Sequence, residues 1–405
     1  MASTDWFRNA IIYHLLIDRF AGHSSPEGLR AEFLGGNLPA LAEKLPYLEE
    51  LGINTLWLSP FCKTNAYHGY HVTDFFQVEP RFGTPDDLKS LIARAHAAGI
   101  RVIADFVPNH CSRSHPFLQE AQQDRHSRYL PWFFFTGWPD RYLCFLDVPE
   151  LPKLNLDYPE ARDHIVSAGK QWLSLGLDGF RLDHVIGPTH AFWKHFRAEI
   201  RRDYPAAVLI GEAWLEGINR RHFTTLRIKN RCLRRLFGVS QEAIQKEYIG
   251  ELDGVLDFRF RSLACGRIAR GGKSAGVLEK TLRGRLSQYP AGYHLPTFLD
   301  NHDTNRFLCE CRNDREKLKA AARLQFALDQ PPIIYYGTEA GMTHLSPVDA
   351  GTPHSDLQAR QPMSWERQDA ELFAFYRELI QRRTAGAASS RSAPAGKRPA
   401  TDNSA

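Results

Sequence analysis

Four short segments of the chain hold carboxylates, three of them together with histidine or arginine, and each segment comes at the end of an apolar run. They are Asp105–His110, Gly179–Asp183, Gly211–Trp214 and Phe298–Asp303. Carboxylates, imidazoles and guanidinium groups are the side chains that nucleophilic and acid–base catalysis require. An apolar run can form a buried strand, and the polar residues at its C-terminal end can then form a site.

Arg181 and Asp183 are two residues apart, so on a strand both side chains point to the same side. An arginine beside an aspartate lowers the pKa of the carboxyl group and keeps it ionised, as a nucleophile must be. A structural ion pair is the alternative for an Arg-x-Asp sequence taken alone.

Glu212 follows Gly211 and precedes Ala213-Trp214, so its neighbours are apolar. Partial burial would raise the pKa of its carboxyl group and suit it to act as a general acid, although a solvated glutamate at a strand end is the alternative. Asp303 with His302, and His110 after Asn109, could bond the hydroxyl groups of a sugar. Each histidine could instead be buried and bonded to the backbone.

The combination is more specific than its members. One ionised carboxylate and one protonated carboxyl group across a common site are the apparatus of glycoside hydrolysis. At a separation of about 5–5.5 Å the reaction would retain the anomeric configuration through a covalent glycosyl-enzyme.

Eight apolar segments can position these residues as strands, and helical patterns lie between them. The predicted strands are 11–20, 53–60, 101–110, 179–185, 207–214, 255–260, 295–302 and 332–339. Thr84 and Pro85 predict the start of one intervening helix, and Gly99 predicts its end. Repeated strand–helix alternation predicts an α/β protein with a parallel (β/α)₈ TIM barrel. An open doubly wound sheet is the alternative, but no Gly-rich phosphate loop follows the first strand.

Composition divides the chain into three parts. Residues 1–110 and 159–383 are predicted to form the barrel, and residues 111–158, rich in proline and aromatics, a small excursion domain over the active site. Its aromatic residues could stack on sugars, although packing within the small domain explains most of them. Residues 384–405 have no large apolar side chain and are predicted to be a disordered tail.

The charge pattern excludes several classes of protein. The net charge is +5, without a dense basic stripe, which argues against nucleic-acid binding. No apolar run is long enough to span a membrane, and the N-terminus lacks the pattern of a signal peptide. The seven cysteines are scattered. Free thiols in a reducing cytoplasm are the simplest interpretation, and a mature secreted form without its leader is the alternative.

With these motifs in this order, the chain resembles the alpha-amylase family, glycoside hydrolase family 13, from about Trp6 to Arg383. Further matching segments are Tyr67–Tyr70, Gly52–Pro60, Gly337–Met342 and Leu151-Pro-Lys-Leu-Asn155. The last segment is similar to the version in neopullulanase- and cyclomaltodextrinase-like members.

The resemblance implies roles for individual residues. Asp183 would be the nucleophile, Glu212 the acid/base and Asp303 the stabiliser of the transition state. The sugar at the cleavage position would be contacted by Tyr70, His110, Arg181 and His302. Asn109 matches a residue that binds structural calcium in many members, but Gly187 falls in an altered context, so calcium is an open question. No catalytic cofactor is implied.

The expected activity is retaining hydrolysis of α-1,4-glucosidic bonds in maltooligosaccharides or starch-like substrates. The alternatives are a transglycosylase or a sucrose- or trehalose-active isomerase, which would use the same carboxylates, and a non-catalytic barrel that serves for binding. The family's usual C-terminal β-sandwich is expected to be absent. Its absence would leave apolar residues of 372–379 exposed and so favour self-association.

Overall fold

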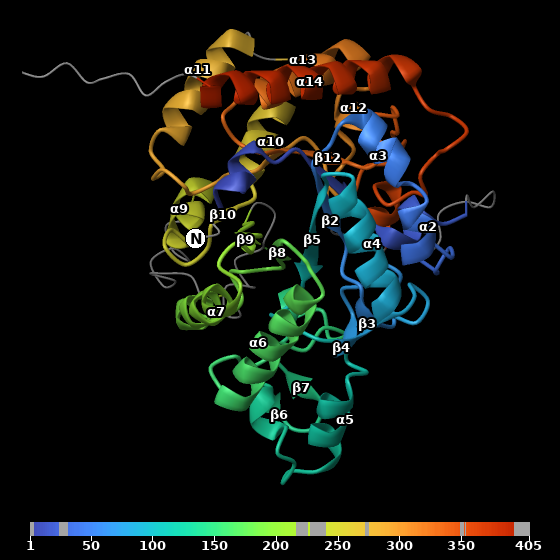
Figure 1. The fold of residues 1–405 in the computed structure, drawn as a ribbon. Helices are drawn as coiled ribbons and strands as arrows, with labels where there is room; N and C mark the ends of the chain where they lie inside the picture. Colours follow the sequence, from blue (N-terminus) through green and yellow to red (C-terminus); the bar gives the residue numbers. More distant parts are fainter. Residues whose placement is uncertain are drawn as a thin grey trace, which may run out of the picture.

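The computed structural model describes residues 4–23, 31–215, 226, 240–271, 275–348, 352 and 354–392. Eight parallel strands form one sheet in the order β10-β9-β8-β5-β2-β1-β12-β11 (Figure 1). Their bounds are β1 Ile12–Leu15, β2 Thr55–Leu58, β5 Arg101–Phe106, β8 Gly179–Leu182, β9 Val208–Gly211, β10 Gly254–Val255, β11 Thr297–Phe298 and β12 Pro332–Tyr335.

The two outer strands of this order come together and close the barrel. Gly254 in β10 forms a parallel bridge with His294, shortly before β11. Val255 N donates to His294 O at 3.1 Å, and Asp257 N donates to Pro296 O at 2.9 Å. The (β/α)₈ barrel predicted from the alternating pattern is therefore confirmed.

Helices surround the strands and cover their outer face (Figure 1). They are α1 Ile17–Phe20, α2 Leu38–Ala42, α3 Leu45–Leu51, α4 Pro85–Ala97, α6 Pro159–Ser174, α7 His190–Asp203, α9 Gln241–Glu247, α10 Phe258–Ala264, α11 Ala275–Leu286, α12 Phe307–Glu310, α13 Arg315–Ala327 and α14 Ala370–Ser392. Thr84 caps α4 in a capping box with Asp87, as the sequence predicts for its start. No helix in the described ranges is long and apolar enough to cross a bilayer.

Apolar side chains inside the barrel form a cluster separate from the larger core between sheet and helices. The inner cluster includes Ile12, Trp57, Ile103, Ile210, Phe298 and Ile333, one from each of six strands. The barrel centre is thus packed, which leaves the strand ends and their loops to form a site.

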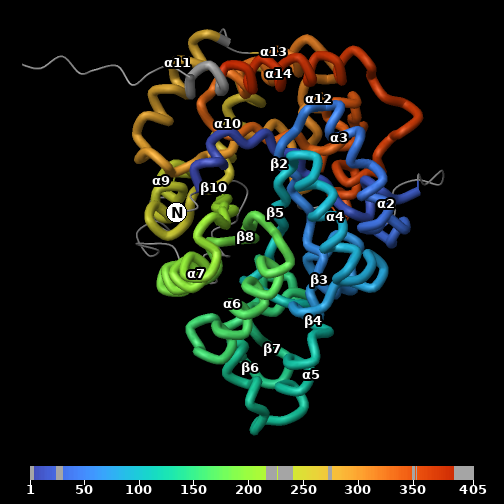
Figure 2. The backbone as a smooth tube through the Cα atoms, viewed as in Figure 1, coloured from blue at the N-terminus to red at the C-terminus, as the bar shows by residue number. Residues whose placement is uncertain are grey.

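The chain leaves the barrel after β5 and returns at α6. Between them lie α5 Pro116–Gln123, β6 Phe135–Gly137 and β7 Arg141–Tyr142, which group together at one end of the molecule beside the hairpin of β3 Cys62–Thr64 and β4 Val72–Val78 (Figures 1 and 2). Trp132 and Phe133 are buried in this excursion. Their burial agrees with packing within the small domain and not with stacking on a sugar.

The predicted strand over residues 255–260 is wrong beyond Val255. The Asp257 side chain accepts a hydrogen bond from Phe260 N and caps α10, which begins at Phe258. The alternating Phe and Arg residues of 258–261 fit a strand pattern, but Asp257 before them caps a helix.

The prediction of a disordered tail from residue 384 is wrong for its first part, since α14 continues to Ser392. Alanine has the highest helix propensity, so an Ala-rich segment can extend an existing helix. Residues 393–405 lie outside the described ranges.

The apolar patch expected on α14 is also absent from the described surface. Leu372, Tyr376 and Leu379 are buried. Phe373 packs against Tyr47 with ring centroids 5.2 Å apart, and the Arg323 guanidinium lies 5.0 Å from the ring of Phe375. The argument for self-association therefore loses its basis, because neighbouring helices already cover this face.

Candidate active site

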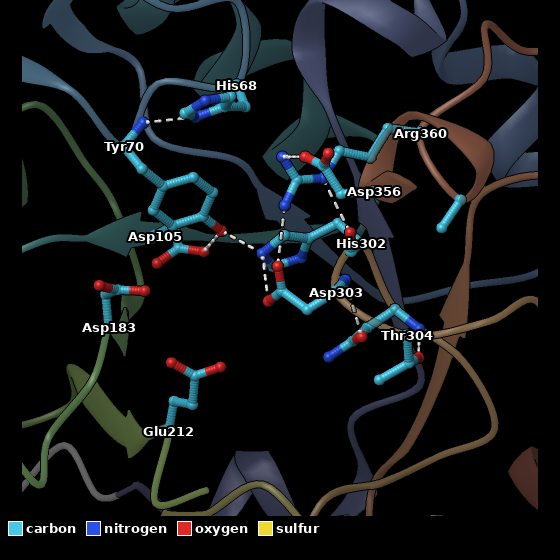
Figure 3. A network of polar contacts seen from close by, with 12 residues as sticks. His68, Tyr70, Asp105, Asp183, Glu212, His302, Asp303, Thr304, Asp356 and Arg360 are labelled. Carbon is cyan, nitrogen blue, oxygen red and sulfur yellow. Dashed lines mark hydrogen bonds and ion pairs between the residues drawn. The ribbon is translucent and has the colours of Figure 1, made fainter. Parts of the chain in front are cut away.

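The polar segments identified in the sequence meet at the C-terminal end of the barrel strands. Asp183 follows β8, Glu212 follows β9, and Asp303 lies in the loop after β11. Figure 3 shows Asp183 and Glu212 side by side, with Asp303 facing them across a common space. The structure thus brings together the three carboxylates that were predicted to act on one substrate.

Arg181 lies at the centre of the acidic groups. Its Nη1 is 2.8 Å from Asp183 Oδ1, and its Nη2 forms an ion pair with Glu212 Oε1 at 2.6 Å. Asp105 on β5 accepts from the same Nη1 at 2.7 Å. Because Arg181 is buried with its partners, one fixed cation sets the positions of both candidate catalytic carboxylates.

Burial raises the pKa of Asp183 well above its usual range, and Arg181 opposes that rise. The sequence predicted the lowering by arginine, but not that burial would outweigh it. Burial also raises the pKa of Glu212, again against Arg181. A raised pKa keeps a glutamic acid protonated closer to neutral pH, as a general acid requires.

Glu212 has a second fixed contact, with the backbone after Asp183. His184 N donates to Glu212 Oε2 at 3.1 Å, and His184 has a positive φ of 44°. This conformation is unusual for a residue other than glycine. The turn at His184 therefore connects the positions of Asp183 and Glu212 through the main chain.

Asp303 lies in a different electrostatic setting. Its Oδ2 is 2.9 Å from His302 Nε2, and its Oδ1 accepts from Arg360 Nη2 at 2.9 Å. Burial alone would raise the pKa of Asp303, but His302, Arg360 and Arg181 together hold it far below the usual value. Asp303 is thus held ionised by its contacts with His302 and Arg360 (Figure 3).

Tyr70 and His302 form the link between the two sides of the site. The Tyr70 hydroxyl donates to Asp105 Oδ2 at 2.7 Å and lies 2.7 Å from His302 Nε2. The two rings stack with centroids 5.2 Å apart. Behind them, His14 Nε2 of β1 lies 3.0 Å from His302 Nδ1.

His110 follows β5 at the same end of the barrel and is buried. Burial lowers its pKa to about 3, with further lowering by His71 and Lys153, so the ring is neutral. Its Nε2 has no hydrogen-bond partner within the described structure. A buried ring nitrogen in this state is able to bond a hydroxyl group of a ligand.

Asn109, the candidate metal ligand, lies where the excursion meets the loop after β8. Its side chain packs against Gly187, and the Lys153 ammonium group donates to the Gly187 carbonyl. Calcium prefers six to eight oxygen ligands that include carboxylates. A lysine in contact with the expected carbonyl ligand does not fit such a site.

Sequence reasoning missed four residues that shape the site: His14, Asp105, Arg360 and Lys153. Asp105 lies in the Asp105–His110 segment and Lys153 in the Leu151–Asn155 segment, but the sequence predicted no role for either. Arg360 lies 57 residues from Asp303, and His14 lies 288 residues from His302. No local spacing reveals contacts over such separations.

Comparison with known proteins supports the interpretation of this geometry. Residues 14–381 match the family described as alpha amylase, catalytic domain. Alpha-amylase 2 of Dictyoglomus thermophilum is 36% identical over 93% of the chain and 63% of its own length. Neopullulanase 2 of Thermoactinomyces vulgaris is 31% identical over 94% of the chain and 63% of its own length.

Solved structures agree. A cyclomaltodextrinase structure superposes with a TM-score of 0.80 at 29% identity, over 95% of this chain and 64% of that one. The cyclic alpha-maltosyl-(1→6)-maltose hydrolase of Arthrobacter globiformis superposes with a TM-score of 0.79 at 26% identity, over 95% of this chain and 84% of that one. The chain spans 63% of the length of alpha-amylase 2 and of neopullulanase 2, which is somewhat less than two thirds.

Proposed function

The chain belongs to the alpha-amylase family, and from that premise we propose that it is a retaining glycoside hydrolase that cleaves α-1,4-glucosidic bonds of maltooligosaccharides or starch-like chains. The observation that carries the proposal is the contact of one buried guanidinium group, that of Arg181, with both Asp183 and Glu212. Asp303 faces this pair and is held by separate cations (Figure 3).

In the proposed first step, Glu212 gives its proton to the glycosidic oxygen while Asp183 attacks the anomeric carbon. The bond to the leaving sugar breaks, and a bond from Asp183 Oδ to the anomeric carbon forms. Arg181 stabilises the carboxylate that Glu212 becomes. Burial raises the pKa of Glu212, which favours its protonated form before the step.

In the second step, Glu212 removes a proton from water, which attacks the anomeric carbon and releases Asp183. Two inversions give net retention. Substrate binding and charge stabilisation are the proposed roles of Asp303, Tyr70, His302 and His110. The fixed ionisation of Asp303 suits it to oppose positive charge that develops on the sugar ring in the transition state.

The described cysteines form no disulfide bonds, which supports the proposal that the protein works in a reducing compartment such as the cytoplasm. Fractionation of the source cells is the direct check.

Product analysis by thin-layer chromatography tests the proposal, with maltoheptaose, cyclodextrin, pullulan and sucrose as substrates and Asp183→Asn as the inactive control. Short maltooligosaccharides from maltoheptaose support hydrolysis of α-1,4 bonds. Products longer than the substrate would indicate transfer instead, and isomers of sucrose without glucan cleavage would contradict the proposed substrate class. No product from any substrate with wild-type protein would favour a binding role.

A further inference from the structure

Lys153 lies in a stretch of the excursion that pairs with the segment that follows β5. His110 and Lys153 form an antiparallel bridge, and Leu154 N donates to Asn109 O at 2.9 Å. On its other side, Lys153 N donates to Leu143 O at 2.9 Å. This backbone pairing holds Lys153 next to Asn109 and directs its side chain toward the loop after Asp183.

The Lys153 side chain is buried, with only 3% of the residue exposed. Its ammonium group donates to the carbonyl oxygen of Gly187, four positions after Asp183 in the chain. Gly187 has room for nothing larger than hydrogen, because a Cβ atom there would collide with Asn109 Oδ1. The ammonium group, the Gly187 backbone and the Asn109 carboxamide therefore meet at one buried point.

Two oxygen atoms at this point could contribute to a cation site. The Gly187 carbonyl is one oxygen, and Asn109 Oδ1 is buried without a hydrogen-bond partner in the described structure. However, no group of three or more His, Cys, Asp or Glu side chains that could hold a metal ion occurs among the described residues. A hard divalent cation needs several anionic oxygens, and these oxygens are not charged.

We propose that the Lys153 ammonium group is a built-in cation that takes the place of a structural calcium ion and joins the excursion to the loop after Asp183. An ammonium group at the Gly187 carbonyl repels a divalent ion and uses the oxygen that such an ion would need. The inference concerns the stability of the fold, so it does not depend on the proposed activity.

The positive charge of Lys153 also lowers the pKa of two neighbouring histidines. After burial, Lys153 is a further cause of the low pKa of His110 and of His184, and both rings remain neutral beside it. Because neither histidine adds a second positive charge, these two neighbours do not repel the Lys153 ammonium group.

The position of the contact indicates what it does. The loop from His184 to Gly187 carries the backbone N–H that donates to Glu212, and Gly187 N donates to His184 O at 3.0 Å. By holding the end of this short loop, Lys153 ties the excursion to the turn between the two candidate catalytic carboxylates. It is a positioning residue and does not touch the reacting atoms.

The first test uses wild-type protein and two readouts that do not involve activity. Equilibrium dialysis with labelled calcium is expected to show less than one bound ion for every ten chains. The melting temperature is expected to be the same in EGTA and in millimolar CaCl₂. Binding of one calcium per chain, or a fall of the melting temperature in EGTA, would overturn the proposal.

The second test changes the cation. Lys153→Met keeps the length of the side chain but removes the charge, and it is expected to lower the melting temperature by roughly 2–4 °C in EGTA and in CaCl₂ alike. Lys153→Asp places a carboxylate beside Asn109 and Gly187, so its melting temperature should rise with CaCl₂ but not with NaCl of equal ionic strength.

Lys89→Asp is the matched control, because Lys89 is exposed on α4 and the same charge change there should have no calcium response. A Lys153→Met variant as stable as wild type would contradict the proposal. If Lys153→Asp does not fold without calcium but folds with it, the proposal is supported. If calcium stabilises Lys89→Asp equally, the effect is not specific to this site and the proposal fails.

Discussion

Arg181 Nη1 lies 2.8 Å from Asp183 Oδ1, a contact between side chains two positions apart, with Arg181 in β8 and Asp183 directly after it. The same guanidinium group reaches Glu212 with its second terminal nitrogen. Because burial raises the pKa of both carboxyl groups while Arg181 opposes the rise, the site can hold one proton and one negative charge next to a fixed cation. That state is the one in which a nucleophile and an acid can act together.

The acid role of Glu212 predicts a dependence on the leaving group. Glu212→Gln should lower kcat/KM for maltotriose by a factor of roughly 10²–10⁴, because the glycosidic oxygen then leaves without a proton. Aryl glycosides with a good leaving group need little protonation and should lose much less in the first step. Equal losses on both substrates, measured by steady-state kinetics, would contradict the assignment.

The burial of the Asp183 carboxyl group predicts that this catalytic residue lowers the stability of the folded protein at neutral pH. Its folded-state pKa is raised above the unfolded value of about 3.9, so its contribution to stability is fully present below that value and is lost as pH rises through the folded pKa. Asp183→Asn removes this loss and should raise the melting temperature at pH 7 by about 1–3 °C.

The gain from Asp183→Asn should shrink as pH falls toward 4, where aspartate is also protonated. Asp140→Asn is the control, since Asp140 is exposed in the excursion and should show no such pH dependence. Differential scanning calorimetry at several pH values measures both variants. A variant less stable than wild type at pH 7 would show that the contact with Arg181 outweighs burial.

The contact between His14 and His302 predicts an effect on catalysis from a residue that touches no substrate. The Tyr70 hydroxyl donates its hydrogen bond to Asp105, so its oxygen accepts at the contact with His302. His302 Nε2 therefore carries the hydrogen and donates toward Tyr70 and Asp303. Burial lowers the pKa of His14 well below its usual range, and its Nδ1 faces the Trp57 carbonyl. Neutral His14 therefore accepts from His302 Nδ1 and fixes the orientation of the His302 ring.

Loss of the acceptor should leave the His302 ring free to turn away from Tyr70 and Asp303. His14→Leu should therefore reduce kcat by roughly 10–100-fold, measured by steady-state kinetics. His14→Gln keeps an acceptor oxygen and should restore most of kcat. If the two variants lose activity equally, His14 acts only through packing.

The sequence predicted the eight strands because each is a continuous apolar run, and it predicted the carboxylates because they follow strand ends. It was wrong where a local polar residue overrides the pattern, as Asp257 does by capping α10 at the end of a predicted strand. It was also wrong about α14, whose aromatic residues are covered by Tyr47 and Arg323 from distant parts of the chain.

The parts of the site that the sequence did not predict are those made by pairs far apart in the chain. Arg360 reaches Asp303 from a loop after β12, and Lys153 reaches Gly187 from the excursion. The balance of burial against charge at Asp183 likewise depends on how completely the fold excludes water. Such properties follow from the packed structure and not from the spacing of residues.

The stereochemistry of the first product tests the central claim most directly. Proton NMR of maltoheptaose hydrolysis, recorded before mutarotation is complete, distinguishes the α and β anomers of the released sugar. We expect the α anomer, because Asp183 attacks first and water displaces it in a second inversion. Release of the β anomer would show a single displacement by water, and Asp183 could not then be the nucleophile.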